Sequence, residues 1–262
     1  MTPPALQTQV NGSVATLTLN RPDVRNAMSH RMVEEIITFF ETLRDDRSVR
    51  AVVIAATGRT FCAGGDFNDL LAEHGMESDE RLAIMARFDH MLRTVNEAPQ
   101  VTIARVQGGA LGGGFGLVCV TDIAIAADNA LFSLPEVRMG LAPALISPYV
   151  IQRIGLTSAR RLMLTGGHLS ADEALRCGVV HEVVPADGLD ARIDALLAEV
   201  RLCAPNALAE TKRLIFEVSG RPPDATLDYR AALITRLRAS EEGQEGISAF
   251  LGKRKPSWAD RS

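Results

Sequence analysis

The chain has 262 residues, with 28 Lys and Arg against 32 Asp and Glu, which gives a formal net charge of −4 at pH 7. This mildly acidic balance argues against a general nucleic-acid surface, although it leaves room for a local basic patch. The length suits one α/β domain with a helical extension, and no apolar run is long enough to cross a membrane.

Cysteine and histidine usage points to an ordinary reduced protein. The four cysteines are scattered in apolar or glycine-rich surroundings, and the five histidines form no cluster with metal-ligand spacing. We therefore expect free thiols and no metal site. Residues 1–4 lack the basic and apolar regions of a signal peptide, so we expect a cytoplasmic protein.

The first predicted elements are a strand and a helix. Val14–Leu19 alternates apolar or β-branched residues with small ones, which is typical of a strand, and residues 20–23 break it. Ser29 is the expected N-cap of the helix that follows. One face of that helix carries Met32, Ile36, Phe39, Phe40 and Leu43.

Two nearly all-apolar runs, Ala51–Ala56 and Val101–Val106, predict buried parallel strands. Each leads into a glycine-rich turn, F-C-A-G-G-D at 61–66 and G-G-A-L-G-G-G at 108–114. Glycine allows backbone to approach backbone closely, and a following helix opens with free N–H groups. If the strands are neighbours, these N–H groups could converge on one developing negative oxygen. Neither turn has the residues of a P-loop or a dinucleotide-binding fingerprint.

The remaining elements continue the alternation of strands and helices. The polar stretch 67–79 is expected to be a loop that shapes a substrate pocket. A helix from Ser78 should face inward with Leu82, Met85, Phe88, Leu92 and Val95. Further strands are predicted at 122–127, 130–133 and 179–184, and helices at 143–154, 156–164, 170–177 and from 205. Such alternation is typical of βαβ units and a parallel sheet.

The order of these motifs resembles the crotonase (enoyl-CoA hydratase/isomerase) superfamily. The resemblance covers nearly the whole chain and includes N-R-P at 20–22, N-A-M at 26–28, L-P-E-V at 134–137, A-D-E-A at 171–174, G-V-V at 178–180 and F-L-G-K-R-K-P at 250–256. It implies an α/β crotonase (ClpP-like) fold, with a β-β-α superhelix core over 1–192. The resemblance also implies a helical trimerisation region over 193–262, and a homotrimer or a hexamer built as a dimer of trimers.

The resemblance also implies a catalytic site. The N–H groups of Ala63 and Gly113 would form an oxyanion hole for the thioester oxygen, and Glu136 would position water and transfer the proton. The alternative for Glu136 is a surface carboxylate paired with Arg138. Two-glutamate hydratases carry a second Glu where this chain has Gly116, which we expect to enlarge the pocket. Water addition with Glu136 alone and migration of the double bond both remain open.

Coenzyme A would enter as part of the substrate, and the resemblance implies no other cofactor. The positions implied to contact the substrate are Arg25, Ala27, Ala63, Gly65, Asp66, Phe67, Gly112 and Gly116. Phe250 and Lys253 match tail positions that contact the adenine and 3′-phosphate end, often from a neighbouring subunit. The alternative for this basic tail is an ordinary solvated run of charge.

The run G-L-A-P-A-L-I-S-P-Y-V at 140–150 is similar to that of bacterial hydratases acting on branched 3-substituted glutaconyl-CoA thioesters. The implied substrates are 3-methylglutaconyl-CoA and isohexenylglutaconyl-CoA, whose distal carboxylate needs a cation. Arg138 is the candidate by proximity, with a surface salt bridge as the alternative. The other hypotheses are a Δ3,Δ2-enoyl-CoA isomerase and a non-catalytic acyl-CoA-binding subunit.

Overall fold

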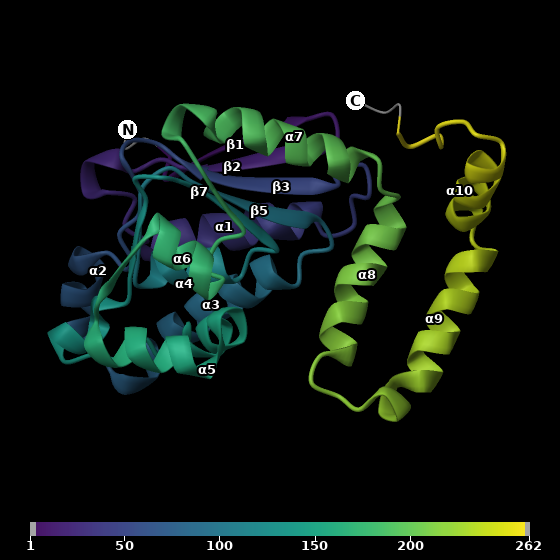
Figure 1. Cartoon of the computed structure of the whole chain (residues 1–262). Coiled ribbons are helices and arrows are strands. Elements are labelled where there is room, and N and C mark those ends of the chain that lie inside the picture. The colour runs from purple at the N-terminus through teal and green to yellow at the C-terminus, as the bar shows by residue number, and fades with distance from the viewer. Residues whose placement is uncertain (1–3, 260–262) are drawn as a thin grey trace.

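The computed structural model describes residues 4–259, so most of the segment tested for a signal peptide and the last three residues lie outside it (Figure 1). Within this range six strands form the main sheet, in the order β1-β2-β3-β5-β7-β10. They are β1 (Leu6–Asn11), β2 (Val14–Leu19), β3 (Ala51–Ala56), β5 (Val101–Val106), β7 (Ile123–Ala127) and β10 (Glu182–Val184). Only the β1–β2 pairing is antiparallel, and the others are parallel as predicted.

A second, smaller sheet has the order β4-β6-β8-β9. Its strands are β4 (Thr60–Cys62), β6 (Gly109–Leu111), β8 (Leu131–Ser133) and β9 (His168–Ser170). Strands β3, β5 and β7 of the main sheet are each followed by a short strand of the second sheet and then by a helical segment. The chain thus repeats a β-β-α unit, and the two glycine-rich turns contain residues of the adjacent parallel strands β4 and β6.

Helices lie on both faces of the main sheet (Figure 1). The helices of the sheet domain are α1 (His30–Leu43), α2 (Phe67–Ala72), α3 (Ser78–Asn96), α4 (Gly113–Cys119), α5 (Ser147–Thr165), α6 (Ala171–Cys177) and α7 (Leu189–Arg201). The Ser29 hydroxyl accepts the Met32 N–H, which confirms the predicted N-cap of α1. On the opposite face, Ile193 and Leu197 of α7 pack with Ile103 of the sheet.

The last three helices, α8 (Pro205–Val218), α9 (Leu227–Ala239) and α10 (Glu241–Leu251), form an arm beside the sheet domain (Figure 1). The boundary expected between residues 192 and 193 falls inside α7. Because the apolar face of α7 packs on the main sheet, the helices that stand apart from the sheet begin at Pro205.

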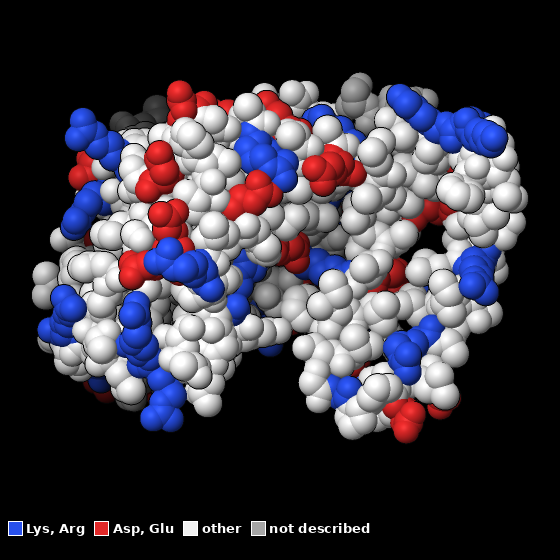
Figure 2. Space-filling view, in the orientation of Figure 1, with Lys and Arg blue, Asp and Glu red and all other residues white. Residues whose placement is uncertain are grey.

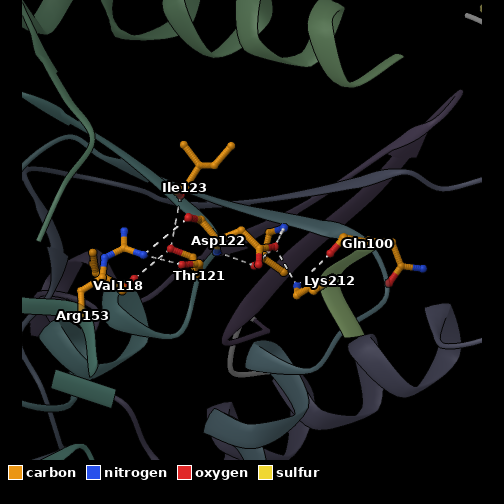
Figure 3. A network of polar contacts seen from close by, with 8 residues as sticks. Gln100, Val118, Thr121, Asp122, Ile123, Arg153 and Lys212 are labelled. Carbon is orange, nitrogen blue, oxygen red and sulfur yellow. Dashed lines mark hydrogen bonds and ion pairs between the residues drawn. The ribbon is translucent and has the colours of Figure 1, made fainter. Parts of the chain in front are cut away.

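A buried polar network attaches the arm to the sheet domain (Figure 3). Lys212 of α8 is only 8% exposed, and its ammonium group lies 2.7 Å from the Asp122 carboxylate. The same ammonium group donates to the carbonyl of Gln100 at 3.0 Å. Burial lowers the pKa of Lys212, while Asp122 opposes that shift. The pairing explains how a lysine can be buried, because the carboxylate and carbonyl replace its lost hydration.

Three local expectations differ from the structure. The stretch after the first glycine-rich turn is α2 and a 3₁₀ turn, because Asp66 caps α2 by accepting the Asn68 N–H. Leu82 is 63% exposed, since burial on α3 is confined to its second half, around Leu92 and Val95. Helix α5 begins at Ser147, and a non-helical Gly155 joins the two helices predicted there.

Surface charge on the face shown in Figure 2 is mixed, with acidic and basic side chains interspersed. The same view shows the surface hollowed between the sheet domain and the arm. A groove at this junction is lined by residues of the α3 end and of α8, among them Glu97, Pro99, Arg213 and Phe216. Among residues 4–259, no helix combines the length and apolarity needed to cross a bilayer.

Candidate active site

The two glycine-rich turns meet, as the sequence predicts. Strands β4 and β6 pair in parallel, with Cys62 opposite Ala110. A Cβ atom on Gly64 would lie 3.0 Å from the Leu111 carbonyl oxygen and 3.5 Å from the Gly113 nitrogen. One on Gly114 would lie 2.4 Å from the Cys62 carbonyl oxygen. Glycine at these positions therefore lets the two backbones touch, and we call this contact the glycine junction.

The structure corrects the expected role of Ala63. Its N–H donates to the Arg25 carbonyl at 3.0 Å, so it is already used within the fold. At Gly65 the N–H has no acceptor among residues 4–259, and this residue lines the cavity described below. The neighbouring Gly64 carbonyl and Asp66 N–H both bond to Met28, so the Gly65 N–H points away from Met28. The Gly113 N–H also lacks an acceptor within the described chain.

Asn26, which the sequence analysis did not single out, fixes the loop in front of the junction. Its side-chain NH₂ donates to the Thr57 and Thr60 carbonyls, each at 2.8 Å, and its oxygen accepts the Arg21 N–H at 2.8 Å. Asn26 is fully buried, and it has a left-handed backbone with φ 54°, as does Arg25 with φ 55°. Asparagine tolerates this conformation better than most residues. The N-R-P and N-A-M motifs contain the signal, but sequence alone does not show these partners.

Asp66 is a structural carboxylate at the edge of the site. Its side chain lies 2.7 Å from the Arg21 guanidinium, which also donates to the Ala27 carbonyl at 2.6 Å. Burial opposes ionisation of Asp66, but hydrogen bonds from Asn68 and Arg21 hold its pKa below the ordinary value. Its bonding capacity is largely used by the protein itself, and it ties the first glycine-rich turn to the loop before α1.

Glu136 lies beside the glycine junction, in the 3₁₀ turn η3 (Pro135–Met139). A Cβ atom on Gly112 would lie 3.1 Å from its Oε1 atom. Its Oε2 atom is buried and has no hydrogen-bond partner within residues 4–259. Burial raises the pKa of the Glu136 carboxyl. An unsatisfied buried carboxylate oxygen is costly, so a fold that keeps one is a candidate for a reactive site.

The alternative pairing of Glu136 with Arg138 is wrong. The Arg138 Nε donates to the Thr165 carbonyl at the end of α5, at 3.2 Å. Its side chain packs beneath Gly166, where an added Cβ would lie 2.9 Å from Arg138 Cγ. Arg138 does not line the cavity described below. The structure therefore does not bring this arginine to the site in which it was expected to bind a distal carboxylate.

The expected enlargement of the pocket at Gly116 is also wrong. A Cβ atom there would lie 2.2 Å from Ile146 Cγ2, so the Ile146 side chain fills this space. Ile146 is 3% exposed and belongs to the main core. The position at which two-glutamate enzymes have a second carboxylate is thus apolar and closed in this chain.

A cavity of about 150 Å³ adjoins the junction at Gly65 and extends between α1, α2 and α3. Its lining residues are Met28, His30, Val33, Glu34, Gly65, Asp66, Asp69, Leu70, Glu73, Ile84, Met85, Arg87 and Phe88. Met28 and Phe88 also reach the second glycine-rich turn, since an added Cβ on Gly113 would lie 2.9 Å from Met28 Cε and 3.2 Å from Phe88 Cζ. We call this space the acyl cavity.

The remaining predicted contact residues lie around the site or on the arm. Arg25 is exposed, and Phe67 is 58% exposed at the start of α2. Gly112 precedes α4 with φ 52°. Phe250 is 84% exposed near the end of α10, and Lys253 follows it in a left-handed conformation with φ 50°. Their contacts with coenzyme A stay predictions.

Comparison with known proteins agrees with this arrangement. A family model described as enoyl-CoA hydratase/isomerase matches residues 9–261. The chain belongs to this family. It is similar to the 2,3-dehydroadipyl-CoA hydratase of Escherichia coli, with 33% identity over 252 residues that cover 95% of this chain and 96% of that protein.

Two solved structures extend the likeness to three dimensions. AtuE of Pseudomonas aeruginosa is 44% identical with a TM-score of 0.95, over 98% of this chain and 100% of that one. An enoyl-CoA hydratase/isomerase from Marinobacter aquaeolei is 42% identical with a TM-score of 0.94, over 98% and 99% of the two chains. The α/β crotonase fold is confirmed, and the protein is an enzyme of the enoyl-CoA hydratase type that acts on acyl-CoA thioesters.

Proposed function

We propose that this enzyme adds water across the α,β double bond of an enoyl-CoA thioester. The observation that carries the proposal is the Glu136 carboxylate, which has a buried, unpartnered oxygen beside the glycine junction. A carboxyl whose pKa is raised by burial exchanges protons more readily near neutral pH than an ordinary glutamate. An incoming water molecule would supply the hydrogen bond that the protein withholds.

Backbone N–H groups at the glycine junction would bind the thioester carbonyl oxygen of the substrate. We assign this role to Gly65 and Gly113, because neither N–H has an acceptor among the described residues. When water attacks C3 of the substrate, negative charge moves onto the thioester oxygen. Fixed donors at that oxygen stabilise the enolate, and one such donor contributes roughly 10²- to 10³-fold in rate.

Glu136 would act both in the step that forms the enolate and in the step that consumes it. As a carboxylate it accepts a proton from water while the hydroxyl group bonds to C3. As a carboxylic acid it returns that proton to C2, so that one water is added in total. Ile146 fills the space beside Gly116, so no second carboxylate stands there to share these roles.

The same apolar closure favours a second candidate, a Δ3,Δ2-enoyl-CoA isomerase. In that reaction one carboxylate moves a proton from C4 to C2, and water takes no part. The oxyanion site and Glu136 would serve both reactions equally. A non-catalytic acyl-CoA binder has no comparable use for the unpartnered Glu136 oxygen.

For the substrate we propose a branched 3-substituted glutaconyl-CoA thioester. The run at 140–150, which contains Ile146, has the form that suggested this class. One relative is named for a thioester of the same broad kind, since 2,3-dehydroadipyl-CoA also carries a distal carboxylate. The candidates are 3-methylglutaconyl-CoA and isohexenylglutaconyl-CoA, with coenzyme A as part of the substrate and no other cofactor.

We also propose that the arm binds neighbouring copies in a trimer or a dimer of trimers. Phe250 and Leu251 are 84% and 75% exposed, which is unusual for large apolar side chains on adjacent positions. Contact with another copy would cover them and bring Lys253 to a coenzyme A phosphate. Light scattering on the Phe250→Asp, Leu251→Asp double variant should show a smaller particle than the original protein, and an unchanged mass would contradict the assembly.

Mass spectrometry tests the reaction. The protein would be incubated in water labelled with heavy oxygen together with crotonyl-CoA, a 3-enoyl-CoA, 3-methylglutaconyl-CoA or isohexenylglutaconyl-CoA, and Glu136→Gln would serve as the control. A product heavier by one labelled water, absent from the control, is expected. Migration of the double bond without label would establish the isomerase instead. Unchanged thioester in all four reactions would contradict both the proposed hydration and the proposed substrates.

A further inference from the structure

The acyl cavity combines apolar walls with an unusual number of charged side chains. Met28, Leu70 and Phe88 contribute apolar surface, but the lining also contains four carboxylates. They are Glu34, Asp66, Asp69 and Glu73. The partners of these carboxylates determine what kind of acyl group the cavity can hold.

Arg87 is already engaged at the rim of the cavity. Its Nε and Nη2 atoms donate to the two carboxylate oxygens of Glu34 at 2.7 and 2.5 Å, in the fork geometry that arginine makes with carboxylates. The hydrogen bond lowers the pKa of Glu34 and raises that of Arg87. A carboxylate on a ligand would have to displace Glu34 to bind this guanidinium.

His30 is engaged as well. Its Nε2 atom lies 2.8 Å from Oε1 of Glu73, whose side chain is only 11% exposed. The His30 backbone N–H, at the first position of α1, donates to the Asp69 carboxylate at 2.7 Å. The His30 ring also faces that carboxylate, with Nδ1 3.9 Å from Oδ2. The imidazole therefore lies between two carboxylates that belong to the protein.

Counting these groups gives the cavity wall an excess of negative charge. Asp66 pairs with Arg21, Glu34 pairs with Arg87, and Glu73 pairs with His30. Four carboxylates thus face at most three cations. Asp69 shares the His30 ring with Glu73, and apart from that ring it has the N-terminus of α1 to offset its charge. Among the described residues that line the cavity, none is a cation without a carboxylate partner.

We infer that the acyl cavity receives an uncharged hydrocarbon arm of the acyl group and excludes a carboxylate. A carboxylate placed here would lose its hydration, find no free cation and meet an excess of like charge. The inference rests on the proposed function, because it assumes that the thioester lies at the glycine junction. It goes further by assigning one end of the substrate to a particular part of the protein.

The consequence for a 3-substituted glutaconyl thioester is a fixed orientation. Such a molecule has two arms at C3, a carboxymethyl group and a hydrocarbon branch. The hydrocarbon branch enters the acyl cavity, and the carboxymethyl group stays outside it. A long branch fills apolar walls such as Met28 and Phe88, whereas a methyl group leaves them empty. The cavity therefore favours the substrate with the longer branch.

Two saturated thioesters of equal chain length test the inference without any chemistry. Hexanoyl-CoA ends in a methyl group, and adipyl-CoA ends in a carboxylate at the same carbon. Isothermal titration calorimetry on the full-length protein should give a dissociation constant at least tenfold lower for hexanoyl-CoA. Equal affinities, or tighter binding of adipyl-CoA, would overturn the inference.

Glu34→Gln is the informative variant, because it keeps the size of the side chain and releases the Arg87 guanidinium. It should lower the dissociation constant of adipyl-CoA relative to that of hexanoyl-CoA by about tenfold. The matched control is Glu41→Gln, on the same helix, which removes a carboxylate 3.7 Å from His90 but outside the cavity. An unchanged ratio in Glu34→Gln, or the same change in Glu41→Gln, would also contradict the inference.

Reaction rates separate this inference from the proposed function. Hexenoyl-CoA and 2,3-dehydroadipyl-CoA differ in the same way as the saturated pair. If neither is hydrated while hexanoyl-CoA still binds more tightly than adipyl-CoA, hydration is wrong and the charge selection stands. If both are hydrated with equal kcat/KM and bind equally, hydration stands and the charge selection is wrong.

Discussion

The glycine junction and the acyl cavity adjoin each other, but they differ in whether their polar groups have hydrogen-bond partners within the protein. At the junction, the Gly65 and Gly113 N–H groups and one oxygen of Glu136 lack partners among the described residues. In the cavity, the side chains of Glu34 and Glu73 are paired with Arg87 and His30. Unpartnered groups are available to a substrate whose charge changes during reaction, whereas paired groups present a fixed surface that selects among substrates.

The acidic side chains show the same contrast in their ionisation. Burial raises the pKa of Glu136, and the hydrogen bond from its own backbone N–H offsets this shift only in part. Asp66 is also buried, yet hydrogen bonds from Asn68 and Arg21 lower its pKa. The residue type alone therefore does not decide which carboxylate can exchange a proton. The partners supplied by the surrounding backbone and cations decide it.

The largest expected effect comes from Glu136→Gln. Loss of the acid/base group should lower kcat by about 10²- to 10⁴-fold. Stability should rise by about 1 kcal/mol at neutral pH, because the variant removes a buried carboxylate with an unsatisfied oxygen. Activity assays and urea unfolding at pH 7 would measure the two changes.

The pH dependence of this stability gain follows from the raised pKa of Glu136. The folded protein holds the proton more tightly than the unfolded chain, so the original protein loses stability as pH rises through the folded pKa. The advantage of Glu136→Gln should therefore shrink as the pH falls toward the ordinary glutamate pKa of 4.5. A variant that is less stable than the original protein at pH 7 would show that the carboxylate has a structural partner.

Asn26→Ala should have the next largest effect, on stability. It deletes the donors to the Thr57 and Thr60 carbonyls and the acceptor of the Arg21 N–H, all at a fully buried site. We expect a loss of about 2–4 kcal/mol, measured by urea unfolding, since several buried polar groups lose partners together. kcat/KM should also fall, because the loop that holds the Ala63 N–H is loosened. A loss below about 1 kcal/mol would mean that water replaces the side chain.

Gly116→Ala tests the closed position beside the junction. The new Cβ would overlap the Ile146 side chain, and we expect a loss of about 1–3 kcal/mol from overpacking. Ile146→Ala alone should be destabilising because it leaves a cavity. The double variant should be more stable than the sum of the two changes predicts, by at least about 1 kcal/mol. Additive losses would show that the two side chains do not compete for this space.

The parts of the molecule that could be predicted from sequence are those set by local pattern. The apolar runs that became β3 and β5, the N-cap at Ser29 and the meeting of the glycine-rich turns all follow from periodicity and glycine placement. The role of Ala63 could not be predicted in the same way. Its N–H is used by Arg25, a partner 38 positions earlier that only the folded chain brings close.

The side-chain contacts within the site could not be predicted from the sequence either. Gly116 suggested an open pocket, but Ile146 comes from a distant segment and fills it. His30 and Glu73 lie on different elements, and their contact depends on how α1 packs beside the turn after α2. Contacts of this kind depend on tertiary packing, for which a residue pattern carries no signal.

Arg138→Ala has the smallest expected effect. It tests whether a residue outside both the glycine junction and the acyl cavity contributes to substrate binding. Arg138 is exposed, donates to the Thr165 carbonyl and lines neither the glycine junction nor the acyl cavity. We expect a stability change within about 0.5 kcal/mol and a KM change below twofold, with a dicarboxylic thioester as substrate. A tenfold rise in KM for that thioester, with none for hexenoyl-CoA, would place the distal carboxylate beside η3 and the end of α5. That outcome would show that Arg138 binds the distal carboxylate after all. It would still agree with a cavity that excludes the carboxylate, because the charged arm of the substrate would then have its own cation outside the cavity.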